Sequence, residues 1–302
     1  MVKDNEIKAT VSPFAIREGE LKVFDGKDGY VSMNQIIHRI NIGHITDVHF
    51  AIIELVNEFE FITSRQLLQM LEWKGIDVGS QDKLNNKLEQ LIKTKILTRY
   101  YFNSEDGKGI YRIYCLEKMG KYLLNSRGID CKWQPTDNTK PVAMIKKRLA
   151  GNQTLIAYLR KVKAFDSYVP KPSFTAKQSG KTFKASGGSV KLTKNNKSIE
   201  FVFEVIRRED EWEKKLVDKM KLYKDFYENF QSGDSGYMSL PQLIIICEDD
   251  KHMAETFKTI VMNKVEISNI KLYFTTDLRQ NEETLEKTLV HFGIDPETRK
   301  YR

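Results

Sequence analysis

Three amphipathic stretches follow one another between residues 45 and 94, and they restrict the fold more than any other feature of the chain. Each repeats apolar side chains at the three- and four-residue spacing of one helix face. The first carries Val48, Ile52, Leu55, Val56 and Phe59. The second begins at Thr63, which forms a capping-box pair with Gln66. The third runs from about Ser80 to Thr94, with Leu84, Leu88, Leu91 and Ile92 on one face.

Two strand-like runs come directly after these helices. They are Ile96–Phe102 and Gly109–Leu116, joined by the polar turn Asn103–Lys108. Three helices followed by a hairpin is the order of a winged helix-turn-helix, which we predict for residues 45–130, with one more helix at Glu117–Asn125. Residues 1–44 form an N-terminal extension, in which the apolar runs at 14–16 and 21–24 predict a hairpin and residues 32–40 predict a short helix.

The second half of the chain has a different organisation. Residues 131–165 are predicted to be a basic linker and a bridging helix, the helix covering 142–162. The remaining residues, 166–302, alternate between strands at 199–206, 243–247 and 272–275 and helices at 211–230, 251–262 and 282–292, after a basic loop or hairpin at 171–198. This alternation indicates a parallel or mixed sheet. The predicted fold class is therefore α+β, a winged helix joined to an α/β domain.

The positive charge of the chain is concentrated in one stretch. The whole sequence has a net charge of +8, but residues 131–200 alone hold 15 Lys and Arg against 3 acidic residues, a net of +12. Such a concentration is the expected footprint of a polyanion contact. A solvated, lysine-rich linker that touches nothing is the alternative interpretation.

The third amphipathic helix is the candidate recognition helix. With its leucines inward, its outward and flanking side chains are those that can read bases or contact phosphate, namely Lys83, Asn86, Lys87, Gln90 and Lys93. The hairpin adds Arg99, Lys108 and Arg112, and the helix of the basic linker adds Lys146, Lys147 and Arg148, all suited to phosphate. Winged helices also serve as protein-binding modules, so double-stranded DNA and a protein partner both remain open at this point.

Glu204 is the acidic residue that fits its position least well. It lies among Phe201, Val202, Phe203, Val205 and Ile206 in a predicted strand, where a carboxylate is costly unless it is paired. One explanation is a metal-dependent nuclease site, which sets a carboxylate on a central strand to hold Mg²⁺. The other is a structural ion pair with Arg207 or Arg208.

Other signatures of chemistry are absent from the sequence. It contains no P-loop, GxGxxG or HExxH motif, and its three cysteines, Cys115, Cys131 and Cys247, form no CxxC pair. We therefore expect no catalytic residues, no metal and no cofactor. The longest apolar run, Leu243–Cys247, is far shorter than the roughly 20 residues of a membrane span, and the first residues have no apolar segment typical of a secretory signal. These features predict a cytoplasmic protein without membrane contact.

The order of several short motifs resembles the replication-relaxation family of plasmid, phage and conjugative-element proteins. The motifs are Phe61-Ile62-Thr63-Ser64-Arg65-Gln66-Leu67, Leu84-x-x-x-Leu88-x-x-Leu91, Ile110–Leu116 with Met119-Gly120 and Leu124, Arg148-Leu149-x-x-Asn152, Phe203-Glu204-Val205 and Lys219-x-x-x-Tyr223. The resemblance covers about residues 45–280. It implies a winged helix joined to a domain related to restriction-endonuclease-like nucleases, and a nucleic-acid context.

The chain departs from the nuclease pattern that this resemblance implies. That pattern needs an Asp on the strand before Glu204 and a Glu-x-Lys on the strand itself, but residues 188–192 contain no acid and Ile206 stands in place of the lysine. Lys219 is a candidate substitute. Glu204 and Lys219 are thus predicted to be a vestigial nuclease site.

From these features we expect a non-enzymatic DNA-binding protein of a mobile element, acting in replication, conjugative transfer or their transcriptional control. A metal-dependent nuclease and an adaptor for a relaxase or replication initiator are the alternatives. Winged helices commonly dimerise to read paired half-sites, so a homodimer through the helix at Glu117–Asn125 is a further expectation.

Overall fold

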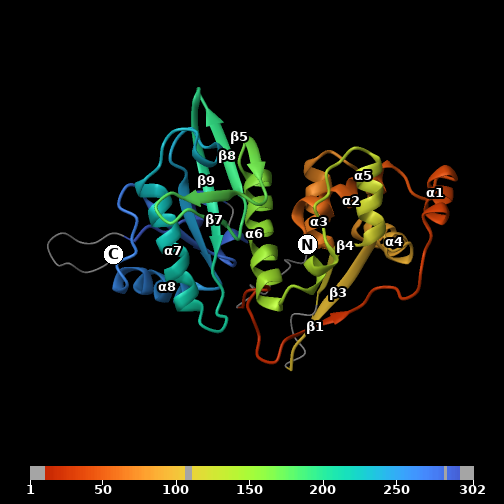
Figure 1. Cartoon of the computed structure of the whole chain (residues 1–302), viewed down its shortest axis with the longest axis horizontal. Coiled ribbons are helices and arrows are strands. Elements are labelled where there is room, and N and C mark those ends of the chain that lie inside the picture. Colours follow the sequence, from red (N-terminus) through yellow and green to blue (C-terminus); the bar gives the residue numbers. More distant parts are fainter. Residues whose placement is uncertain (1–10, 106–110, 282–283, 293–302) are drawn as a thin grey trace, which may run out of the picture. The chain divides into compact units, whose positions relative to one another are not determined.

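The computed structural model describes residues 11–105, 111–281 and 284–292, and it is a mixed α+β structure. The chain divides into two compact units. The N-terminal unit is Ile16–Arg160, and the C-terminal unit consists of the described residues of Met1–Ala15 and Lys161–Arg302. Each unit has its own sheet (Figure 1). Within the described ranges, no helix is both long enough and apolar enough to cross a membrane.

The N-terminal unit follows the helix and hairpin order that the sequence predicts. Its helices are α1 (Met33–Asn41), α2 (Asp47–Phe59), α3 (Ser64–Trp73), α4 (Gln81–Lys93), α5 (Lys118–Ser126) and α6 (Val142–Lys161), the last reaching one residue past the boundary of the unit. The capping box before α3 is confirmed, because the Gln66 backbone N–H donates to the Thr63 hydroxyl (3.2 Å) and the Thr63 N–H donates to the Gln66 side chain (3.1 Å).

An antiparallel four-stranded sheet completes this unit, in the order β1-β3-β4-β2. The strands are β1 (Leu21–Phe24), β2 (Ile62–Thr63), β3 (Leu97–Asn103) and β4 (Arg112–Leu116). The predicted hairpin between residues 14–16 and 21–24 is wrong. Residues 21–24 pair instead with β3, from Leu21 opposite Asn103 to Phe24 opposite Tyr100. The seven residues of β3 offer more backbone N–H and C=O partners than the three residues at 14–16 can. The local sequence pattern around residues 21–24 does not reveal that β3 is the available partner.

The C-terminal unit is built on a mixed five-stranded sheet in the order β11-β10-β9-β8-β5. β9 (Lys197–Val205), β10 (Gln242–Cys247) and β11 (Leu272–Thr276) are parallel, whereas β8 (Ser189–Lys194) and β5 (Phe165–Val169) are antiparallel to their neighbours. Helices α7 (Trp212–Glu228) and α8 (Asp250–Met262) and the small hairpin β6 (Ser173–Ala176) and β7 (Lys181–Lys184) pack on it, and their buried side chains form one core with those of β9, β10 and β11.

Of the loop and the hairpin predicted at 171–198, the hairpin is confirmed. Residues 171–198 form most of two hairpins, β6–β7 and β8–β9, and Phe174 and Phe183 are buried against α7. Another prediction for this unit needs correction. The prediction of a helix at 282–292 is wrong for residues 284–292. Residues 282 and 283 lie outside the described residues. Only a 3-10 turn at Leu285–Thr288 is present, and Val290 then bridges to Phe274 through two backbone hydrogen bonds of 2.8 Å.

Candidate nucleic-acid interface and polar clusters

Helix α4 presents a polar outer face with few internal partners. Its side chains Leu84, Leu88, Leu91 and Ile92 are buried, as the sequence predicts. Lys83, Asn86, Gln90 and Lys93 are exposed and Lys87 is half-buried. The side chains of Lys83, Asn86, Lys87 and Lys93 make no hydrogen bond or ion pair with any residue that the structure describes.

Gln90 is the member of this face that has a fixed internal contact. The backbone N–H of Thr46 donates to His49 Nδ1 (3.1 Å), so His49 Nε2 carries the proton and donates to Gln90 Oε1 (2.8 Å). Burial lowers the pKa of His49, and the positive charge of Lys87 lowers it further. The neutral His49 ring therefore orients the Gln90 side chain, and the amide N–H groups of Gln90 stay available as donors.

The hairpin residues that the sequence proposes for phosphate contact differ in how exposed they are to solvent. Arg99 is only 9% exposed and pairs with Asp25 (Nε to Oδ2, 2.8 Å) and with Glu89, so its prediction as a phosphate contact is wrong. Arg112 has a mostly exposed side chain and also contacts Asp25, at 3.1 Å. Lys108 lies outside the described residues.

Helix α6 does not present all three of its predicted phosphate contacts, Lys146, Lys147 and Arg148, to solvent. Lys146 is completely buried, and its Nζ lies 2.5 Å from Glu20 Oε2 and over the ring of Phe102. Arg148 is largely buried, with its Nε 3.6 Å from Glu60 Oε2, and Lys147 is half-buried. The predicted DNA contacts of Lys146 and Arg148 are therefore wrong. The signal for this burial was present in the sequence, because Lys146 adjoins Ile145 and lies one helical turn from Leu149 on the same apolar face.

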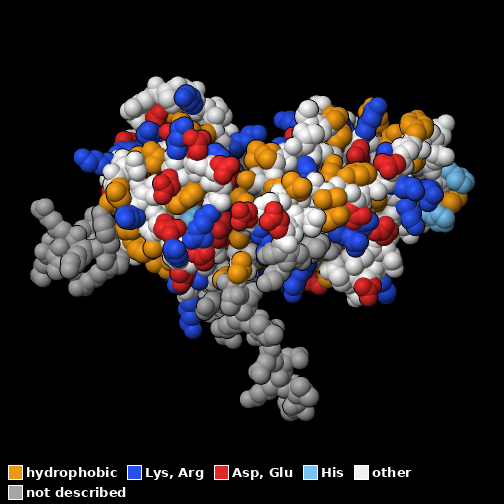
Figure 2. Space-filling view, turned by 90° about the horizontal axis from the view of Figure 1, so that it is seen from below, with side chains coloured by type: hydrophobic (Ala, Val, Ile, Leu, Met, Phe, Trp, Pro, Cys, Tyr) orange, Lys and Arg blue, Asp and Glu red, His pale blue; other side chains and the backbone are white. Residues whose placement is uncertain are grey.

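Charge on the surface is mixed rather than arranged as a stripe on the face drawn in Figure 2, where basic and acidic side chains are interspersed on each unit. Many of the described lysines lie beside a carboxylate of the same unit, as Lys177 does beside Asp234 (2.6 Å) and Lys215 beside Glu209 (2.9 Å). A count of charges along the sequence therefore overstates the positive charge that a polyanion would meet.

Glu204 and Lys219 come together in the C-terminal unit, with Lys219 Nζ 3.8 Å from Glu204 Oε2. The Glu204 carboxylate, on β9, is only 4% exposed. It accepts hydrogen bonds from the Ser186 hydroxyl at Oε1 and from the Tyr223 hydroxyl at Oε2, both 2.7 Å. Lys219 and Tyr223 are one helical turn apart on α7, which brings both to the same carboxylate. Arg207 and Arg208 are not its partners, so the alternative ion pair considered from the sequence is wrong.

This cluster does not fit a catalytic magnesium ion. Mg²⁺ requires several oxygen ligands in near-octahedral geometry, usually including one or two carboxylates together with water or substrate phosphate. Here there is one carboxylate, both its oxygens already accept from protein hydroxyls, and a lysine lies beside it. Among the described residues, no group of three or more His, Cys, Asp and Glu is placed to hold a metal ion.

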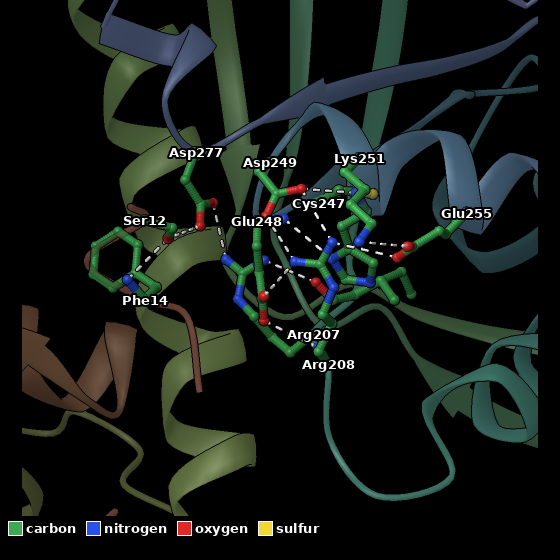
Figure 3. A network of polar contacts seen from close by, with 12 residues as sticks. Ser12, Phe14, Arg207, Arg208, Cys247, Glu248, Asp249, Lys251, Glu255 and Asp277 are labelled. Atoms are coloured by element: carbon green, nitrogen blue, oxygen red, sulfur yellow. Dashed lines mark hydrogen bonds and ion pairs between the residues drawn. The ribbon is translucent and has the colours of Figure 1, made fainter. Parts of the chain in front are cut away.

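A second polar network lies where the three parallel strands end (Figure 3). The carboxyl ends of parallel strands meet at one edge of a sheet, which is where α/β folds commonly place a site. Arg207 follows β9 and is completely buried, with its Nη2 2.9 Å from Oδ1 of Asp277, which follows β11. Asp277 also accepts from the hydroxyl of Ser12, so the N-terminal segment is joined to this edge. The Nε atom of Arg207 is buried without a hydrogen-bond partner in the described part of the chain.

Arg208 joins three carboxylates in the outer half of this network. Its two Nη atoms contact both carboxylate oxygens of Asp249, at 2.6 and 3.1 Å, and reach Glu248 and Glu255, each at 3.3 Å. The hydrogen bonds from Arg208 lower the pKa of Asp249 to about 2. Sequence reasoning missed this network, although the acidic pair Glu248-Asp249 directly after a buried strand was a visible signal.

His252 lies under the network on α8 and is completely buried. Its Nδ1 accepts from the Glu248 backbone N–H (3.3 Å), and its ring packs edge-to-face against Trp212 at a centroid distance of 4.9 Å. Burial, with the positive charges of Arg208 and Arg207, lowers the pKa of His252 to about 3. The imidazole is therefore neutral in the folded protein at ordinary pH.

Replacing Lys146 by Ala should destabilise the N-terminal unit by about 3–5 kcal/mol, because Glu20 is left buried and unpaired. Urea unfolding followed by circular dichroism measures this loss. Lys132→Ala, at an exposed lysine of the same unit, is the matched control and should stay within about 0.5 kcal/mol of the wild type. A Lys146→Ala variant as stable as the control would contradict the burial of this pair.

Acidification should destabilise the C-terminal unit through His252. The unfolded chain binds a proton on this histidine near pH 6.5, whereas the folded chain does so only near pH 3. Stability is therefore complete above about pH 6.5 and is lost as the pH falls, by about 2 kcal/mol between pH 7 and pH 5. Unfolding is followed by Trp212 fluorescence after Trp73 and Trp133 are replaced by Phe. His252→Gln should remove this pH dependence and His38→Gln, at an exposed histidine, should keep it; equal slopes in both variants would refute the assignment.

Comparisons with known proteins do not show a family for this chain. No protein-family model matches it, and no curated protein matches it. Among solved structures, that of the restriction endonuclease FokI is similar at a TM-score of 0.29 and 10% sequence identity. The match covers 77% of this chain and 42% of the FokI chain. A likeness at this level supports no conclusion about fold or activity.

Proposed function

We propose that the chain is a non-enzymatic protein that binds double-stranded DNA by placing α4 in the major groove. The observation that carries this proposal is the outer face of α4, where Lys83, Asn86, Lys87 and Lys93 have no partner among the described residues. The resemblance of the motif order to replication-relaxation proteins supports a role in the replication, transfer or transcriptional control of a mobile element.

The architecture of the N-terminal unit supports this use of α4. Three helices followed by a hairpin is the order of a winged helix-turn-helix, and the short strand β2 closes the hairpin by pairing Ile62 with Tyr114 of β4. In a helix-turn-helix protein the recognition helix lies in the major groove and its side chains reach the base edges. The four buried apolar side chains of α4 fix which of its faces is turned outward.

The chemistry of the face suits a duplex. Asn86 and Gln90 are one helical turn apart and offer amide groups, which can pair bidentately with adenine. The lysines supply contacts to guanine or phosphate. One acidic residue of α4, Glu89, is already paired with Arg99, so it opposes an approaching phosphate less than a count of charges suggests.

Exchanging Lys83 and Lys87 for Glu should abolish sequence-selective binding, because both side chains border the proposed contact. We expect a loss of affinity of at least about 100-fold for a duplex selected by the wild-type chain from random DNA, measured by fluorescence anisotropy. Lys118→Glu with Lys132→Glu is the matched control, since it makes the same change in charge at exposed lysines of the same unit outside α4. Selective binding retained by a folded α4 variant would exclude α4 as the recognition helix.

The C-terminal unit should not cleave DNA. Phosphodiester hydrolysis with Mg²⁺ needs carboxylates available to the ion, and the Glu204 carboxylate is occupied by Ser186 and Tyr223. Supercoiled and linear DNA incubated with the protein and Mg²⁺ or Mn²⁺ should both stay intact. Cleavage by the wild type that is lost in Glu204→Gln, which keeps the shape of the side chain, would make the chain a nuclease instead.

A further inference from the structure

The hairpin of β8 and β9 extends beyond both strands that flank it (Figure 1). β5 pairs with β8 only as far as Leu192, and β10 pairs with β9 only from Phe201 onward. Thr193 still donates its backbone N–H to the carbonyl of Ala164, just before β5 (2.7 Å), so it is the last pair of the hairpin, Lys194 with Lys197, that has no strand on either side. Asn195 and Asn196 close the hairpin with φ values of 51° and 59°, the left-handed pair of a tight two-residue turn. The tip is thus a short and well-defined two-stranded ribbon.

Charge on this ribbon is neutralised at its base and left unbalanced at its tip. At the base, Lys191 lies opposite Glu200 and 3.4 Å from Asp166. At the tip, Lys194 and Lys197 are exposed, lie directly opposite each other and form no ion pair with a described residue. Like charges at directly opposed positions destabilise a hairpin. An anion between the two ammonium groups would reverse the sign of that interaction.

The turn adds two asparagine amides beside the lysine pair. Lysine and asparagine are side chains that commonly contact the sugar–phosphate backbone of DNA. The hydroxyls of Thr193 and Ser198 lie 2.9 Å apart on the opposite face of the ribbon, where the Thr193 hydroxyl also contacts Asp166 Oδ2 (3.1 Å). The face that carries Lys194 and Lys197 has no acidic residue between positions 193 and 198.

We propose that the tip of the β8–β9 hairpin, residues 193–198, is a second DNA contact that binds backbone phosphate between Lys194 and Lys197. The identity of the polyanion rests on the proposed function, but the site lies in the C-terminal unit and does not depend on α4. Because phosphate is the same in every sequence, this contact strengthens binding to all duplexes alike. Lys146 is buried and Arg148 is largely buried, each beside a carboxylate, whereas Lys194 and Lys197 belong to the same basic stretch, residues 131–200, and are exposed to an approaching phosphate.

The test is Lys194→Gln with Lys197→Gln in the full chain, with Lys214→Gln and Lys221→Gln as the matched control on α7. Both pairs are exposed lysines of the C-terminal unit, so the change in net charge is equal. Dissociation constants are measured for a selected and an unrelated duplex over a range of NaCl concentrations. The hairpin variant should bind both duplexes about tenfold more weakly near physiological salt, and its slope of log K against log salt should be shallower by about 1.8, two phosphate contacts at roughly 0.9 each. The control should match the wild type.

Each outcome supports or contradicts a DNA contact at the tip of the β8–β9 hairpin. An unchanged slope in the hairpin variant, or an equal loss in the control, would overturn the proposal. Circular dichroism checks the fold, and the retained Asn195-Asn196 turn keeps the ribbon closed. The Lys83→Glu, Lys87→Glu variant is measured beside these two. If it binds like the wild type while the hairpin variant is weakened, the hairpin contact stands and the α4 assignment fails; if only the α4 variant is weakened, the reverse holds.

Discussion

The lysine and the arginine that are completely buried in the described part of the chain, Lys146 and Arg207, each lie beside a carboxylate, because an unpaired buried charge costs several kcal/mol. Lys146 meets Glu20 in the N-terminal unit, and Arg207 meets Asp277 in the C-terminal unit. Each of these pairs joins segments that are far apart in the sequence. Arg207 and Asp277 follow different strands of one sheet, and Ser12 binds to the same aspartate. The pairing of buried charge therefore fixes how several elements meet and which basic residues remain for a partner.

The sequence predicts a feature of this structure well when the interacting residues are close together in the sequence, and poorly when they are far apart. The capping box at Thr63 and the leucine face of α4 are local, and both are found where the pattern predicts them. The partner of Lys146, Glu20, is more than a hundred residues away, so the local sequence indicates that Lys146 lies on the buried face of α6 but does not identify the carboxylate it pairs with. The pairing of β1 with β3 and the bridge from Val290 to Phe274 also depend on distant strands, and the local patterns there predicted a different hairpin and a helix.

Glu204 shows what a sequence pattern can decide about a candidate site and what it cannot. A carboxylate in the middle of an apolar strand needs partners, and that requirement is correct. Its partners are hydroxyls and a lysine, contributed by Ser186, Tyr223 and Lys219, and not the neighbouring arginines. Lys219 and Tyr223 are connected with Glu204 by the resemblance to the replication-relaxation family, and their spacing of four residues places them on one face of α7. Ser186 could not be connected with Glu204 from the sequence, because its contact depends on how the chain turns into β8.

If both proposed contacts form, they divide the work of binding between the two units. The outer face of α4 offers groups that distinguish base pairs, whereas the hairpin tip offers groups that bind phosphate in any sequence. The chain passes between the units twice, after Ala15 and after Arg160, so a unit that has bound DNA holds the other at a high effective concentration near the same duplex. Two modest contacts can then give tight binding in which only one of them carries the specificity. A protein of this kind needs neither a strongly basic recognition domain nor an enzymatic site in its second domain.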